Sequence, residues 1–210
     1  MLRITNEDNM KLMSRYEDNY FDLAIVDPPY GINGGGDNRK AINTKSKNNL
    51  RRLGRAGGLG WDKETPQKKY FKELFRVSKN QIIFGGNYFI ENLKNTRCLI
   101  VWDKMTYIPS MAQIETAWTS FNSHSKLIKI NSNQLNRIHI SQKPVKLYEW
   151  LLKNYAQEGH KILDTHLGSG SIAIACHNLH FDLTACELDK DYFDAAMKRI
   201  NNHKKQLRLF

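Results

Sequence analysis

The stretch that decides the fold is residues 161–187, KILDTHLGSGSIAIACHNLHFDLTACE. It begins with a short apolar run ending at Asp164, which indicates a buried strand, and then passes through the small residues Gly168–Gly170. Apolar residues predict a helix from there to about His180. A second apolar run, Leu183–Glu187, predicts the next strand. Strand, turn, helix and strand in this order are typical of a parallel α/β sheet.

The rest of the chain extends this pattern. An apolar run before Asp27 indicates a buried strand, which Pro28 stops. Amphipathic patterns predict helices over 144–159 and 192–205. The other predicted elements are a helix over 65–78 with Thr65 as N-cap and Pro66 as first helical residue, strands over 81–84, 98–102 and 114–121, and a short helix over 88–93. We therefore predict an α/β fold: one Rossmann-like domain over residues 1–210, with a mostly parallel sheet flanked by helices.

Composition limits the class of protein. Hydrophobic residues make up 40% and charged residues 25% of the 210 residues, an ordinary globular mixture. No apolar run reaches the length of a membrane span, and the polar N-terminus does not resemble a signal peptide. We expect a cytoplasmic protein without a membrane partner. Three scattered cysteines do not suggest a disulfide framework.

The chain is strongly basic. Its formal net charge is +11, from 32 Lys and Arg against 21 Asp and Glu. This charge favours a polyanionic partner, nucleic acid first, and a merely solubilising surface is the equal alternative. Residues 31–60 hold eight of the 13 glycines, and no acid lies between Asp37 and Asp62. The basic residues of this segment are Arg39, Lys40, Lys45, Lys47, Arg51, Arg52 and Arg55. We interpret the segment as a mobile functional loop.

The C-terminal third carries the pattern of a nucleotide site. Asp164 ends a predicted strand, and the loop Gly168, Ser169 and Gly170 opens a helix whose free N–H groups suit a ligand. Glu187 ends the next strand, 17 positions after Gly170, where an acid can accept hydrogen bonds from ribose hydroxyls. The three-glycine spacing of hydride-transfer enzymes is absent. A plain strand-to-helix turn is the alternative for this loop alone.

A second motif stands at the end of the N-terminal strand, and it is Asp27-Pro28-Pro29-Tyr30. Open α/β sheets bind ligands at this end of their strands. The prolines stiffen the turn and remove backbone donors. Asp27 can accept one hydrogen of a planar amine, the Pro28 carbonyl can accept the other, and Tyr30 can stack on the ring. The motif therefore matches a base that carries an NH₂ group.

Together the two motifs resemble the DNA amino-methyltransferases that modify adenine N6 or cytosine N4. In that family the Asp-Pro-Pro-Tyr motif is catalytic and the glycine loop holds S-adenosylmethionine. The order of the motifs here resembles the family's β arrangement, in which the catalytic half comes first. Residues 139–144 resemble the family's His-Pro-Thr-Gln-Lys-Pro segment, and residues 61–62 and 84–89 resemble further blocks beside the catalytic site.

The resemblance assigns roles to residues of this chain. It implies catalytic roles for Asp27, Pro28, Pro29 and Tyr30, and cofactor contacts for Asp164, His166, Gly168, Ser169, Gly170 and Glu187, with Lys143 and Pro144 at the methionine end. His166 stands where the family usually has an aromatic residue that packs near the cofactor. Such a pocket requires the target base to leave the stack, and Tyr30 would replace the lost stacking.

Substrate and partner follow from the same resemblance. Asp in the catalytic motif favours adenine N6, whereas cytosine N4 enzymes more often carry Ser there. Cytosine N4, an RNA or protein-amide substrate, and an inactive DNA-binding relative are the alternatives. Cytosine C5 chemistry needs a nucleophilic cysteine, which enzymes of that kind place after a proline, and no cysteine of this chain follows a proline. The family context implies double-stranded DNA, restriction-modification and a homodimer. Residues 122–138, where the β arrangement usually carries target recognition, are short, so we expect the 31–60 loop to supply much of the DNA contact.

Two remaining patterns have plainer alternatives. Cys176, His177, His180 and Cys186 suggest a metal, but without a CxxC pair we interpret them as packing and surface residues, with no metal. The tail Gln206, Leu207, Arg208, Leu209 and Phe210 resembles the peptide with which bacterial proteins dock on the replication sliding clamp. An apolar tail packed on its own domain is the equal alternative.

Overall fold

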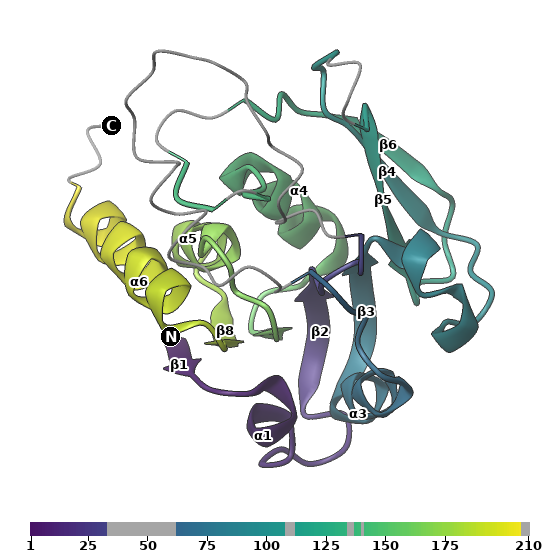
Figure 1. Ribbon diagram of the computed structural model, residues 1–210, viewed down its shortest axis with the longest axis horizontal. Coiled ribbons are helices and arrows are strands. Elements are labelled where there is room, and N and C mark those ends of the chain that lie inside the picture. The colour runs from purple at the N-terminus through teal and green to yellow at the C-terminus, as the bar shows by residue number, and fades with distance from the viewer. Residues whose placement is uncertain (33–61, 108–111, 134–136, 140, 207–210) are drawn as a thin grey trace.

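One mixed sheet organises the protein. The computed structural model describes residues 1–32, 62–107, 112–133, 137–139 and 141–206. Eight strands of this part pair in the order β1-β8-β7-β2-β3-β5-β4-β6 (Figure 1). The strands are β1 (Leu2–Asn6), β2 (Phe21–Val26), β3 (Ser78–Phe84), β4 (Leu99–Asp103), β5 (Ile114–Thr119), β6 (Lys126–Lys129), β7 (Lys161–Asp164) and β8 (Asp182–Glu187). All neighbours pair in parallel except β5, which is antiparallel to both β3 and β4.

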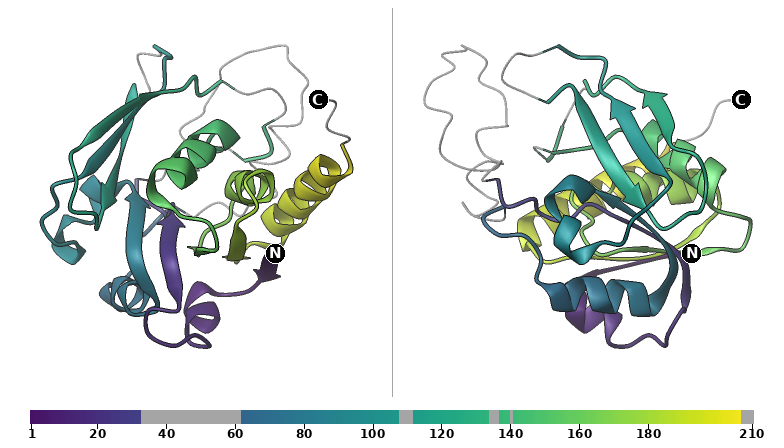
Figure 2. Two further views of the ribbon diagram at one scale, coloured as in Figure 1. Left: turned by 180° about the vertical axis from the view of Figure 1, so that it is seen from behind. Right: turned by 90° about the vertical axis from the view of Figure 1, so that its right-hand side faces the viewer.

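Helices cover both faces of the sheet. They are α1 (Asn9–Met13), α3 (Lys68–Val77), α4 (Val145–Tyr155), α5 (Ser171–Asn178) and α6 (Lys190–Lys205), with two single turns, η1 (Gly86–Tyr88) and η2 (Ile90–Asn92). Figure 2 shows α1 and α3 on the side of the sheet opposite α4, α5 and α6. Two buried clusters, one on each face, agree with this layering.

The alternation of a buried strand explains the two clusters. In β2, Leu23 and Ile25 pack in the cluster that includes α4 and α5, while Ala24 and Val26 pack with α1 and α3. All four are fully buried, as expected for a parallel strand covered on both sides. The continuous apolar run before Asp27 is therefore the sequence signature of a central strand.

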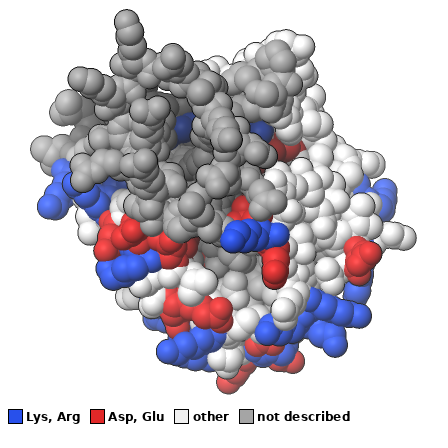
Figure 3. All heavy atoms as spheres, in the orientation of Figure 1, with Lys and Arg blue, Asp and Glu red and all other residues white. Residues whose placement is uncertain are grey.

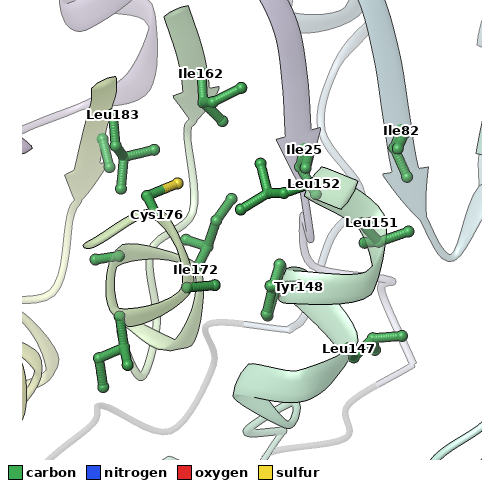
Figure 4. Packing of buried hydrophobic residues seen from close by; sticks show 14 of the residues in the cluster. Ile25, Ile82, Leu147, Tyr148, Leu151, Leu152, Ile162, Ile172, Cys176 and Leu183 are labelled. Carbon is green, nitrogen blue, oxygen red and sulfur yellow. The ribbon is translucent and has the colours of Figure 1, made fainter. Parts of the chain in front are cut away.

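Helix α4 supplies much of the packing on its face. Its buried residues Leu147, Tyr148, Leu151 and Leu152 recur at helical spacing and belong to the same buried cluster as Ile25 and Ile82 of the sheet. Figure 4 shows this stripe beside Ile25, with the neighbouring helix α5 packed alongside. This packing anchors the segment just before α4, which carries side chains of the candidate site.

The parallel strands β7 and β2 lie at the point where the connections turn to opposite sides: β2 leads to β3 toward one edge of the sheet, and β7 leads to β8 toward the other. Helix α3 connects β2 to β3 on one face, and α5 connects β7 to β8 on the other. Such a switch point leaves a crevice at the carboxyl ends of the adjacent strands, where open α/β sheets bind ligands. Asp27, Asp164 and Glu187 stand at the ends of β2, β7 and β8, so all three belong to this edge.

The predicted fold class is confirmed, and the differences concern details. Strand β6 lies within residues 122–138, where the sequence predicted no strand, and β1 and α1 were not expected either. Helix α3 begins at Lys68 behind Gln67, not behind Thr65. Thr65 packs instead against Gly31, where an added Cβ would lie 3.2 Å from the Thr65 methyl group. The expected helix over 88–93 consists of two 3₁₀ turns. None of the described helices is both long and apolar enough to cross a membrane.

Candidate active site

A cavity of about 1340 Å³ opens at the carboxyl edge of the sheet. Its wall includes Asp27, Pro28, Pro29 and Tyr30 after β2, and also the loop after β7 and Glu187 at the end of β8. The tertiary structure therefore brings the two sequence motifs, more than 130 positions apart along the chain, into one space. Residues from β4, β5 and the segment before α4 also line this cavity.

Both oxygens of the Asp27 carboxylate are engaged. Oδ1 accepts a hydrogen bond from the Tyr30 hydroxyl at 2.6 Å, and Oδ2 accepts one from the Lys143 ammonium. The Asp27 side chain is 18% exposed and the Lys143 side chain 3%. Burial raises the pKa of Asp27, and the adjacent Lys143 charge opposes this effect. Asp27 is thus a partly buried acceptor at the cavity wall.

A second carboxylate fixes the turn that carries Tyr30. Asp62 accepts hydrogen bonds from the backbone N–H of Tyr30 at 2.6 Å and of Gly31 at 3.0 Å. Gly31 has φ +72°, which other residues rarely adopt, so the chain can bend sharply after the two prolines. The buried Asp62 belongs to the family block predicted to flank the catalytic motif. Its role here is to hold the loop in shape.

The ring of Tyr30 already has an aromatic partner. Tyr88 stacks on it with centroids 4.8 Å apart and planes 13° from parallel. Gly85, at φ +68°, approaches the same ring so closely that a Cβ would lie 2.2 Å from Cε1 of Tyr30. Tyr88 is 43% exposed and lines the cavity. Its stacking contact was not anticipated from the sequence, although its block of residues was.

Further charged residues at the site were missed by sequence reasoning. The Lys143 ammonium lies 3.1 Å from Oε2 of Glu115 on β5, and Lys104, just after β4, lies 2.6 Å from Oε1. Burial opposes ionisation of Glu115, but the two ammonium groups outweigh it and lower the pKa of Glu115. The available signal in the sequence was Glu115 itself, the single acid of the predicted strand over 114–121. Lys143 was expected at the methionine end of the pocket, and it contacts Asp27.

The glycine loop is held by the acid at the end of β8. Oε2 of Glu187 accepts a hydrogen bond from the Gly168 N–H at 2.8 Å, and Oε1 accepts one from the Asp189 N–H at 3.0 Å. Gly168 has φ +52°, and a Cβ there would meet no described atom closer than 3.9 Å. Each Glu187 oxygen keeps acceptor capacity. The loop and the acid thus form a polar cradle at the cavity.

Most residues predicted to bind the cofactor line the cavity, His166, Ser169 and Lys143 among them. Asp164, Gly170 and Pro144 are not among the described lining residues. Asp164 is 2% exposed and accepts the His166 N–H at 2.9 Å, and burial raises the pKa of Asp164 to about 8. Gly170, at φ +73°, begins α5 against Ile200, and Pro144 is the buried N-cap of α4. These three shape the loops behind the wall.

His166 takes part in a hydrogen-bonded chain. Its Nε2 lies 3.1 Å from Nδ2 of Asn9, and its Nδ1 lies 2.9 Å from Oγ1 of Thr165, which lies 2.7 Å from the Tyr70 hydroxyl. An amide nitrogen only donates, so Nε2 is the acceptor and Nδ1 carries the proton. Burial lowers the pKa of His166 to about 4, which leaves the ring neutral near pH 7. A neutral imidazole thus occupies the position of the family's aromatic residue.

Other predicted sites fall partly or wholly outside the described residues. These are the basic residues Arg39, Lys40, Lys45, Lys47, Arg51, Arg52 and Arg55, and the tail residues Leu207, Leu209 and Phe210. Gln206 is described and is the C-cap of α6. Among the described residues no group of three or more His, Cys, Asp or Glu side chains could hold a metal ion. Cys176 and Cys186 are buried in the two clusters.

Solved structures define the class of protein. M1.HpyAVI in complex with SAM superposes over 96% of this chain and 100% of its own, with a TM-score of 0.61 at 19% sequence identity. The PvuII DNA methyltransferase, described as cytosine-N4-specific, superposes over 96% of this chain and 90% of its own, with a TM-score of 0.64 at 12% sequence identity. At these identities the likeness concerns the fold. The chain has the Rossmann-like fold of DNA methyltransferases.

Sequence comparison then places the chain in a family. The N6/N4 methyltransferase family model, described as DNA methylase, matches residues 94–198. The Type II methyltransferase M2.DpnII of Streptococcus pneumoniae is 22% identical over 247 residues, covering 94% of this chain and 88% of its own length. The chain belongs to the N6/N4 DNA methylase family and is a DNA amino-methyltransferase. Both adenine N6 and cytosine N4 are targets within this family.

Proposed function

We propose that this protein methylates N6 of adenine in double-stranded DNA, with S-adenosylmethionine as the methyl donor. The observation that carries the proposal is the position of Asp27, a carboxylate at the end of β2 that faces the same cavity as the Gly168–Glu187 cradle. An acceptor for an amine hydrogen and a cradle for a nucleoside therefore share one space. Cavities of this kind, at a switch point of the sheet, suit a reaction between two bound molecules.

The residues on the cofactor side fit S-adenosylmethionine. The Glu187 oxygens, each holding one backbone N–H, have acceptor capacity left for ribose hydroxyls. Arg199 donates to the Ser169 carbonyl at 2.8 Å and to the Ser171 hydroxyl at 2.9 Å, which fixes the loop against α6. The side chain that Gly168 lacks would project where the ligand is expected.

On the base side, the task of the protein is alignment. When bound, S-adenosylmethionine supplies a methyl group on a sulfonium sulfur, so that forming the new N–C bond breaks the C–S bond and leaves a neutral thioether. Asp27 accepts a hydrogen of the target amine, which turns the nitrogen lone pair out of conjugation with the ring and offsets the positive charge that develops. The extra proton then passes from the nitrogen to water, so that the products are the N-methylated base, the neutral thioether and one proton. Tyr30 and Tyr88 bring aromatic surface to the place where a flipped base enters.

Adenine is preferred over cytosine because the catalytic motif begins with Asp. The alternative is cytosine N4, and the similarity in fold to the cytosine-N4-specific PvuII enzyme favours testing it directly. Both bases present an exocyclic amine to the same acceptor, so the reaction at Asp27 is shared. The identity of the methylated nucleoside distinguishes the two.

The basic segment is the proposed DNA contact. Residues 31–60 contain seven basic residues and one acid, a net charge of +6 within the total of +11. On the face shown in Figure 3, basic and acidic side chains of the described residues are interspersed, without one large basic field. A segment with so dense a positive charge suits the phosphate backbone. We propose that it holds the duplex over the cavity.

The test is transfer of tritiated methyl groups to unmethylated duplex DNA, followed by nucleoside analysis. We expect labelled N6-methyldeoxyadenosine, and labelled N4-methyldeoxycytidine would move the target to cytosine. Label only in RNA or protein would refute a DNA substrate. Asp27→Asn is expected to reduce kcat by about 1000-fold or more and to leave S-adenosylmethionine binding, followed by calorimetry, within a factor of about two. Substantial turnover by this variant would contradict the role of Asp27.

A further inference from the structure

Four charged side chains form a continuous chain across the base side of the cavity. Lys143 bonds to Oδ2 of Asp27, its ammonium lies 3.1 Å from Oε2 of Glu115, and Oε1 of Glu115 lies 2.6 Å from Lys104. The side chains are between 3% and 22% exposed. Two carboxylates and two ammonium groups make the chain neutral as a whole, which limits the cost of burying it.

Lys143 competes with a target amine for Asp27. The Tyr30 hydroxyl lies on Oδ1 and the ammonium on Oδ2, and the ammonium offsets the negative charge with which Asp27 would attract an amine hydrogen. An ammonium held there would also repel the positive charge that develops on the amine nitrogen. The arrangement suits a resting state, and transfer requires the ammonium to withdraw from Oδ2.

Glu115 holds the ammonium on another side. Its Oε2 is buried and lies 3.1 Å from Nζ of Lys143, and its other oxygen is held by Lys104. The centroid of the Phe84 ring lies 4.6 Å from Nζ and covers a further side of the ammonium. A small rotation of the Lys143 side chain can therefore break the contact with Asp27 and keep the ion pair with Glu115, without exposing the charge to water.

The strand order explains why Glu115 is there. β5 runs antiparallel to β3, so its first residues lie at the edge where the parallel strands end. In the pairing of β4 and β5, Glu115 lies opposite Trp102, and both line the cavity. An acid at the start of this reversed strand thus reaches the same crevice as an acid at the end of β2.

We propose that Glu115 is a positioning residue for methyl transfer: it takes the Lys143 ammonium when the target amine binds and so frees Oδ2 of Asp27 to accept an amine hydrogen. This inference rests on the proposed function, because it concerns the same acceptor. Lys104 acts at one remove by holding Oε1 of Glu115. Lys143 supplies the charge that keeps Asp27 ionised between turnovers.

The inference predicts opposite pH effects for two substitutions. Burial raises the pKa of Asp27, and Lys143 opposes and Glu115 adds to this shift. The charged and titratable groups that bear on Asp27 are Lys143 before α4, Tyr148 on α4, Glu115 on β5, Lys104 after β4, Asp164 at the end of β7, Tyr70 on α3 and Tyr30 on its own loop. Lys143→Met should move the acid limb of the kcat profile up by about one pH unit or more, and Glu115→Gln should move it down.

The experiment measures steady-state methyl transfer to duplex DNA from pH 5 to 9 by the wild type and these variants. At the pH optimum, Glu115→Gln is expected to lower kcat by about tenfold or more with little change in the KM for DNA, and Glu115→Asp is expected to restore part of it. Glu91→Gln, an exposed acid on η2, is the matched control and should behave as wild type. Thermal melting and S-adenosylmethionine binding verify folding of every variant.

The outcomes separate this inference from the proposed function. Acid limbs that move in opposite directions, with a lowered kcat for Glu115→Gln, support the exchange of the ammonium. Limbs that move together or stay in place, or an unchanged kcat for Glu115→Gln, overturn it while methylation by the wild type upholds the proposed function. A wild type that transfers no methyl group to DNA overturns both.

Discussion

Gly85 is the position at which the smallest change should do the greatest damage to the site. It lies in the left-handed region at φ +68°, and an added Cβ would lie 2.2 Å from Cε1 of Tyr30. Ordinary carbon contacts are about 3.5–4.0 Å, so in Gly85→Ala the Tyr30 ring must move by roughly 1.3 Å or more. The backbone conformation itself costs the variant about 1 kcal/mol.

Displacement of the Tyr30 ring should affect catalysis through its hydrogen bond to Asp27. Its hydroxyl holds Asp27 at 2.6 Å, and a displacement of this size takes the hydroxyl beyond hydrogen-bonding distance. Misplacing an aligning group by about 1 Å costs on the order of 100-fold in rate. We therefore expect Gly85→Ala to lower kcat by about 100-fold and the free energy of unfolding by about 1–3 kcal/mol.

The measurements are methyl transfer at saturating DNA and S-adenosylmethionine, and urea denaturation. Gly159→Ala is the matched control, because Gly159 has φ +80° but no atom of the described residues lies within 4 Å of an added Cβ. It carries the same backbone cost without the collision, so it should lose about 1 kcal/mol of stability and keep its activity. A Gly85→Ala enzyme with the kcat of Gly159→Ala would refute the reasoning, since the contact with Tyr30 would then have no catalytic consequence.

Three further predictions concern the contacts of Arg199, two histidines and the basic segment. Arg199→Met should raise the KM for S-adenosylmethionine by about tenfold with little effect on the KM for DNA, because the guanidinium holds the Ser169 carbonyl at 2.8 Å; equal changes in both would contradict it. Burial lowers the pKa values of His139 and His166 to about 4, below the usual 6.5, so their contribution to stability is complete above pH 6.5 and is lost as the pH falls toward 4. Denaturant titrations should find a loss of up to about 3 kcal/mol per histidine, and His166→Phe should flatten this dependence. Deleting residues 38–55 should weaken DNA binding and reduce its salt dependence, and an unchanged affinity would exclude this segment as the DNA contact.

The elements with strong local patterns were predictable. The strand-to-helix stretch around Gly168, the apolar strand before Asp27 and the amphipathic helix after Pro144 are all found close to their expected bounds. Short elements at the margin of the sheet were not. Strand β6, four residues long, is stabilised by pairing with β4 rather than by its own pattern, so its sequence carries too weak a signal.

The candidate site divides in the same way. The motifs at Asp27 and Gly168 were recognisable because each needs particular residues at fixed spacing within one loop. The contacts of Lys143 were not, since its partners Asp27 and Glu115 come from two other strands. Nor was the stacking of Tyr30 on Tyr88, which depends on how two loops meet.

The sequence by itself determined the fold class, the two motifs and the family, because these depend on local periodicity and on residues close together in the chain. Only the tertiary structure decided that the two motifs share one cavity, and that a reversed strand brings Glu115 to the same edge as Asp27. The physical reason is that strand order and direction arise from packing over the whole sheet. The pKa values of buried groups depend on that same packing, as the raised value of about 8 for Asp164 illustrates.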